Sequence, residues 1–143
     1  MAVLSILKFP DPRLHTVAQP VSTFDAALQS TIDDMFETMY SAKGVGLAAT
    51  QVDIHHRIVV VDTSEERDQP LVFINPEIVA QSVEQKEWEE GCLSVPGIYD
   101  TVSRAEYVTV EASDIDGNPF KPHGSQDAIA AGVGMVHQHF MLV

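Results

Sequence analysis

The hydrophobic pattern that begins after Thr23 predicts an amphipathic helix. Its apolar residues recur at three- and four-residue spacing: Leu28, Ile32, Met35, Phe36 and Met39. This spacing places a single apolar stripe along a helix. Thr23 suits the N-cap, Asp25 the first turn and Gly44 the C-terminal stop. Upstream, three prolines in residues 8–22 predict an extended arm, because each fixes its own backbone and disfavours helix in the residue before it.

Three segments after the helix have strand-like patterns. Residues 57–62 are rich in β-branched residues, and residues 71–74 form a short apolar run that should end at Asn75-Pro76. In residues 105–112, Val108 and Val110 alternate with polar neighbours, as in a sheet with one solvated face. The order of elements shows no β-α-β alternation. It predicts an α+β fold with an N-terminal helix packed on short, mainly antiparallel strands.

Length and charge narrow the function classes. The 143 residues suit one domain, and their composition, 45% hydrophobic and 20% charged, is that of a globular protein. A net charge of −13 argues against nucleic acid or anionic lipid as a partner. The sequence has neither a run of about 20 apolar residues nor a basic leader, so we expect a cytoplasmic protein without membrane contact.

Residues 44–51 read Gly-Val-Gly-Leu-Ala-Ala-Thr-Gln and lie between the predicted helix and the first strand. Two glycines allow close backbone approach, so this loop can hold a substrate backbone. A helix cap followed by a tight connector is the alternative. Gln51 can donate to a developing oxyanion, or it can be an ordinary surface residue. The segment is no phosphate loop, because no Gly-Lys-Ser/Thr follows.

The single cysteine, Cys92, follows two carboxylates and a glycine. Negative neighbours disfavour a bare thiolate, which argues against a free cysteine nucleophile. A divalent cation would stabilise the thiolate and would be attracted by the same acidic surroundings. The alternative is a buried structural cysteine.

Together the two segments resemble the signatures of the peptide deformylase family. Residues 44–51 are similar to its first signature, and Glu90-Gly91-Cys92-Leu93-Ser94 is similar to its second. The resemblance covers about residues 3–121. It implies a metal-dependent hydrolase that removes the formyl group from N-formylmethionyl peptides or nascent chains.

The resemblance also implies roles for individual residues. Cys92 would be a ligand of one catalytic Fe(II) or Zn(II) ion. Gln51 and the backbone N–H of Leu93 would stabilise the oxyanion formed at the formyl carbon. Gly46 would hydrogen-bond the peptide backbone, and Val45 would line the methionine pocket. One thiolate and two imidazoles would leave an open position for a nucleophilic water.

The family's third signature, a His-Glu-x-x-His helix, is absent from this sequence. From about Ser125 onward, some 19 residues resemble instead the Q-loop region of ATP-binding cassette ATPases. We therefore predict two parts, a deformylase-like domain in residues 1–121 and a divergent segment in residues 122–143 that is foreign or truncated. The metal-binding helix of the family is expected to be missing.

His137 and His139 are candidate substitutes for the missing ligands. Residues two apart point in different directions on a helix but share a face on a strand, so a site of Cys92 and these two histidines is geometrically conceivable on a strand. Two histidines at a frayed end are the alternative. The other candidate histidines are expected to be surface residues: His15, His55 and His56.

The predicted function is therefore that of a peptide deformylase. Two alternatives stay open because the third signature is absent. One is a catalytically impaired module that still binds peptides, and the other is a truncated or chimeric fragment.

Overall fold

The structure is a computed structural model of the whole chain and describes residues 2–119. Its helix, α1 (Ala26–Ser41), confirms the amphipathic pattern, and Ile32, Met35 and Met39 are buried. The N-cap is Asp25 and not Thr23, because the Asp25 carboxylate accepts a 3.0 Å hydrogen bond from the Leu28 N–H.

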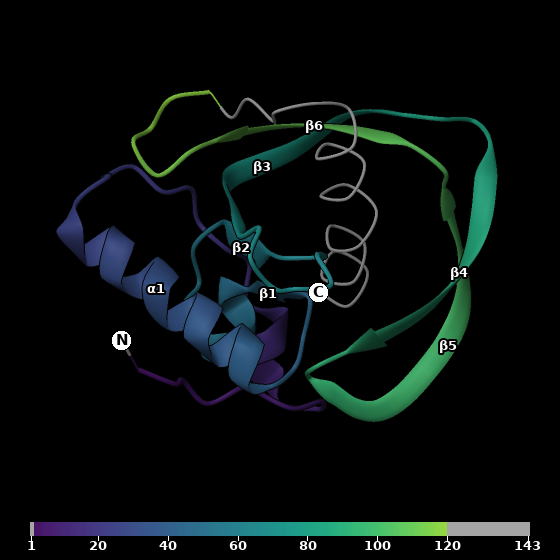
Figure 1. Cartoon of the computed structure of the whole chain (residues 1–143), viewed down its shortest axis with the longest axis horizontal. Helices are drawn as coiled ribbons and strands as arrows, with labels where there is room; N and C mark the ends of the chain where they lie inside the picture. The colour runs from purple at the N-terminus through teal and green to yellow at the C-terminus, as the bar shows by residue number, and fades with distance from the viewer. Residues whose placement is uncertain (1, 120–143) are drawn as a thin grey trace.

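The strands form two antiparallel groups (Figure 1). A four-stranded sheet has the order β1-β2-β3-β6, and its strands are β1 (Gly46–Ala48), β2 (Ile58–Val61), β3 (Leu71–Gln81) and β6 (Val108–Ser113). A separate hairpin pairs β4 (Gln85–Cys92) with β5 (Val95–Ala105). Two 3-10 turns complete the fold, η1 (Pro12–His15) and η2 (Ala49–Val52). The predicted α+β class with antiparallel strands is confirmed.

The core lies between α1 and the first strands. Met35 and Met39 pack with Leu47 of β1, Val60 of β2 and Ile74 of β3, and all five are at most marginally exposed. Figure 1 shows α1 on the opposite side of β1 and β2 from the β4–β5 hairpin. Within residues 2–119, α1 therefore does not cover the hairpin side of the sheet, where a site can form.

The strand predicted to end at Asn75-Pro76 continues to Gln81. Asn75 has a left-handed φ of 54°, and the pairing of β3 with β6 changes register after Ile74. The Asn75 side chain compensates by bonding the N–H and C=O of Val21 at 2.7 and 2.9 Å. The dipeptide therefore forms a bulge within one strand and does not end it.

Two sequence predictions concern the C-terminal part. The missing metal-binding helix and the divergent segment from residue 122 lie outside the described residues, so the proposed division at residue 121 stays a prediction. Among residues 2–119, no helix has the length and apolar character needed to cross a membrane.

Candidate functional site

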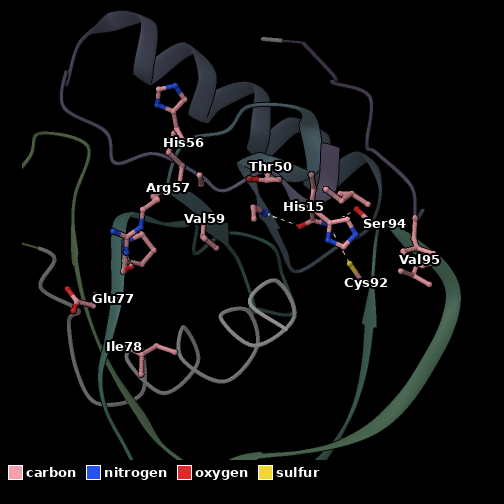
Figure 2. A pocket seen from close by; sticks show the side chains of 17 residues that line it. His15, Thr50, His56, Arg57, Val59, Glu77, Ile78, Cys92, Ser94 and Val95 are labelled. Atoms are coloured by element: carbon pink, nitrogen blue, oxygen red, sulfur yellow. Dashed lines mark hydrogen bonds between the residues drawn. The ribbon is translucent and has the colours of Figure 1, made fainter. Parts of the chain in front are cut away.

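A cavity of about 550 Å³ opens between η1, η2, the start of β2, the middle of β3 and the turn of the β4–β5 hairpin (Figure 2). Most of its lining is apolar. Gln51, Cys92 and Ser94 contribute polar atoms to its wall, as do His15 and His56. The two segments that resemble family signatures thus meet at one cavity.

The Gln51 side chain is buried, with 3% of its surface exposed, and is held at both ends. Its Oε1 accepts a 3.0 Å hydrogen bond from the Ala48 N–H. Its Nε2 donates to Ser94 Oγ at 3.1 Å and to Cys92 Sγ at 3.5 Å. A backbone N–H can only donate, so Ala48 fixes which end of the amide faces the sulfur. Gln51 therefore presents a donor to Cys92.

Cys92 is half-buried at the end of β4, and Leu93 follows it in the turn of the hairpin. The Leu93 carbonyl accepts a 3.2 Å hydrogen bond from Lys8 Nζ. The Leu93 side chain packs against Gly44, where an added Cβ would lie 2.7 Å from Leu93 Cδ1. A side chain at position 44 would therefore collide with Leu93, unless Leu93 moved.

The N-terminal arm ties the two signature segments together. The Leu7 N–H donates to the Gln51 carbonyl at 2.7 Å, and the Phe9 N–H donates to the Ser94 carbonyl at 2.8 Å. The two donors, Leu7 and Phe9, are two residues apart in one extended stretch. The arm therefore fixes η2 relative to the hairpin turn.

Gly46 lies in β1, which is an edge strand of the four-stranded sheet. The Val45 carbonyl accepts a 2.9 Å hydrogen bond from the Asp62 N–H, so the backbone of Val45 faces β2. Backbone groups alternate in direction along an antiparallel strand. The N–H and C=O of Gly46 therefore point away from β2 toward the open edge of β1, the side that has no paired strand within residues 2–119.

Glu90 does not act as a free carboxylate beside Cys92. Arg104 of β5 donates to both of its oxygens at 2.9 and 3.1 Å, and both side chains are less than a fifth exposed. Such a bidentate pair fixes geometry as well as charge. Neither Arg104 nor Lys8 was recognisable as a site residue from the sequence, since their partners lie 14 and 85 residues away.

The histidine predictions have mixed outcomes. His137 and His139 lie outside the described residues, so their role as ligands stays a prediction. His15 and His56 are exposed as expected but also line the cavity, while His55 is half-buried and bonds Asp53 at 2.8 Å. Within residues 2–119, no three His, Cys, Asp or Glu side chains gather closely enough to hold a metal ion.

Comparison with known proteins matches this arrangement to one family. A family model described as polypeptide deformylase matches residues 3–133. The match extends past Ser125, and the comparisons give no support to the resemblance to an ATP-binding cassette ATPase.

Individual relatives agree. The chain is 69% identical to a peptide deformylase of Chromobacterium violaceum over 121 residues, which are 85% of this chain and 72% of that protein. The crystal structure of a peptide deformylase from Legionella pneumophila has 52% identity and a TM-score of 0.81, covering 88% of this chain and 75% of that one. A class I type b peptide deformylase from Acinetobacter baumannii has 33% identity and a TM-score of 0.84, covering 100% and 96%. This chain belongs to the peptide deformylase family.

Proposed function

We propose that this protein is a metal-dependent hydrolase that removes the formyl group from N-formylmethionyl peptides or nascent chains. The observation that carries the proposal is the donation from Gln51 Nε2 toward Cys92 Sγ at the wall of the cavity. In this arrangement Cys92 would bind the metal and Gln51 would donate to the oxyanion. A cytoplasmic location, where a lone thiol stays reduced, belongs to the same proposal.

Cys92 fits the role of a metal ligand. Its sulfur lines a cavity with room for a substrate, and the Gln51 amide, which donates to it at 3.5 Å, suits a thiolate acceptor. Fe(II) and Zn(II) both bind thiolate, and His137 and His139 are proposed as the further ligands. When bound, one such ion supplies an activated water and polarises the formyl oxygen.

Gln51 and Leu93 are proposed to stabilise the oxyanion. The formyl oxygen gains negative charge when the carbon becomes tetrahedral, and a donor already oriented toward it lowers the barrier. Gln51 is oriented before any substrate arrives, because Ala48 holds its Oε1 and Ser94 accepts from its Nε2. The Leu93 N–H would be the second donor.

The peptide is proposed to bind along the open edge of β1. Gly46 directs its N–H and C=O toward this edge, so an extended peptide could add to the sheet as a further strand. Val45, which is half-buried next to this edge, is proposed to line the pocket for the methionine side chain. A solved relative from Ehrlichia chaffeensis, 42% identical with a TM-score of 0.80, is in complex with actinonin.

The test combines metal analysis with turnover of formyl-Met-Ala-Ser. Purified protein should contain one equivalent of Fe or Zn and should release formate. Cys92→Ala should lose both, whereas the control His56→Ala, which removes an imidazole from the same cavity, should keep both. His137→Ala and His139→Ala test whether these two histidines are the further metal ligands.

Two results would contradict the proposal in different ways. Metal-free protein that binds the peptide without releasing formate would identify a peptide-binding module. Protein that neither binds metal nor peptide would contradict the function altogether.

A further inference from the structure

The loop of residues 62–69 between β2 and β3 is built around a buried carboxylate. Asp62 has no exposed surface. Its carboxylate accepts hydrogen bonds from the Tyr40 hydroxyl at 2.6 Å, the Ser64 hydroxyl at 2.5 Å, and the backbone N–H groups of Ser64 and Gln69 at 2.9 and 3.2 Å. Four donors on one carboxylate fix the loop at both of its ends and against the end of α1.

Arg67 is the cation of this otherwise acidic loop, and its side chain returns to the sheet. Its Nη1 donates to the Gly44 carbonyl at 2.8 Å and to the Asp62 carbonyl at 3.2 Å. Gly44 precedes β1, and Asp62 follows β2. One guanidinium nitrogen therefore joins the two strands just beyond the ladder bond from the Asp62 N–H to the Val45 carbonyl.

Gly44 is a junction between Arg67 and the proposed oxyanion site. Its N–H donates to the Met39 carbonyl at 2.9 Å, so both of its backbone polar groups are bonded. The space beside its Cα is filled by the Leu93 side chain. The position of Gly44 therefore sets how closely the start of β1 approaches Leu93.

We propose that Arg67 is a positioning residue for peptide binding, acting through Gly44 on the edge of β1. The inference rests on the proposed function, since it assigns Arg67 to the placement of the Gly46 edge. Leu93 has a separate anchor in Lys8, which bonds its carbonyl. Loss of Arg67 therefore weakens peptide binding more than it slows the chemical step.

The test uses Arg67→Asn in the full chain. Arg67 has a left-handed φ of 58°, and asparagine tolerates that conformation, so the substitution removes the guanidinium without straining the loop. We expect KM for formyl-Met-Ala-Ser to rise about tenfold with kcat within about twofold, the pattern of lost binding without lost chemistry. Arg67→Lys should recover most of KM, because an ammonium can also donate to both carbonyls. The control Glu66→Asn, at an exposed position of the same loop, should behave as the unaltered protein.

Amide hydrogen exchange gives a readout that does not need turnover. In Arg67→Asn, exchange of the Asp62 N–H should accelerate at least about tenfold relative to Glu66→Asn, while the core amides of α1 keep their rates. Unchanged exchange and unchanged KM would overturn the inference. So would a uniform acceleration with kcat and KM altered together, which indicates general destabilisation. If the unaltered protein lacks turnover, the proposed function fails, and the exchange result alone decides whether Arg67 holds β1.

Discussion

Gln51 and Ser94 are 43 residues apart in the chain, and the Gln51 amide nitrogen donates a 3.1 Å hydrogen bond to the Ser94 hydroxyl. Ser94 has 4% of its surface exposed. Ser94→Ala removes the acceptor and lets the amide turn away from its present direction. We expect kcat to fall about tenfold, less than the roughly 100- to 1,000-fold cost of deleting an oxyanion donor outright. Steady-state kinetics at unchanged metal content measure the effect, and an unaltered kcat would contradict it.

Gln51→Met removes the donor while keeping a side chain of similar length. We expect kcat to fall roughly 100- to 1,000-fold with little change in KM, because the donor matters most when charge develops on the formyl oxygen. Metal content should remain at the level of the unaltered protein. A rise in KM with kcat preserved would show that Gln51 binds the substrate and does not stabilise the oxyanion.

Gly44→Ala places a methyl group against Leu93, 2.7 Å from its Cδ1. Crowding of this kind costs about 1–3 kcal/mol of unfolding free energy, and it should also displace the hairpin turn and lower kcat. The double variant Gly44→Ala/Leu93→Ala makes room for the methyl and keeps the backbone N–H at position 93. It should regain much of the lost kcat. Urea unfolding and kinetics on both variants test this, and a double variant as impaired as the single one would refute it.

The pairing of Glu90 with Arg104 should stabilise the hairpin. Arg104→Met leaves a mostly buried carboxylate without its partner. Because both side chains retain some exposure, we expect a loss of about 2 kcal/mol, below the roughly 3–5 kcal/mol of a fully buried pair. The double variant Glu90→Gln/Arg104→Met should be more stable than Arg104→Met alone. Urea midpoints of the four proteins in this cycle give the coupling energy.

Asp62 should make stability depend on pH. Burial alone raises the pKa of Asp62, but hydrogen bonds from Ser64, Tyr40 and Gln69 outweigh burial and lower its pKa below the ordinary value. The carboxylate thus stabilises the fold above its unfolded pKa of about 4, and this contribution is lost as the pH falls through the lower folded pKa. Asp62→Asn should cost about 2 kcal/mol at pH 7. The difference in urea midpoint should shrink below about pH 4, and a constant difference from pH 7 to pH 3 would contradict this origin.

The sequence predicted the elements whose signal is local. The stripe from Leu28 to Met39 defined α1, and the β-branched run at residues 57–62 defined β2. The N-cap was predicted at Thr23 but lies at Asp25. Both residue types suit an N-cap, and only the hydrogen bond from the Leu28 N–H shows which of them takes the role. The prediction that the strand ends at Asn75 was wrong, because hydrogen bonds with the distant Val21 compensate for the bulge.

The β4–β5 hairpin had no recognisable strand signal. Residues 85–92 are mostly polar, with no apolar alternation to indicate a buried face. Cross-strand contacts hold the hairpin together instead, among them Arg104 with Glu90 and Ser103 with Gln85. The residues that the resemblance pointed to, Gln51 and Cys92, lie together at one cavity, and their roles stay predictions. The contacts of Lys8, Arg67 and Arg104 could not be predicted, because they depend on how separate segments of the chain fold together.

The hydrogen bond from the Ala48 N–H to Gln51 Oε1 joins two residues that are only three apart in the sequence. Gly46 and Gln51 lie within six consecutive residues, and this bond ties the Gln51 amide to the residue that ends β1. Cys92 belongs to the hairpin, which Gln51 bonds directly at Cys92 and Ser94. The N-terminal arm adds a second link, through the bonds from Leu7 to Gln51 and from Phe9 to Ser94. The distance between the Cys92 thiol and the Gln51 amide therefore depends on contacts between segments far apart in the sequence, whereas the distance between that amide and Gly46 is set locally.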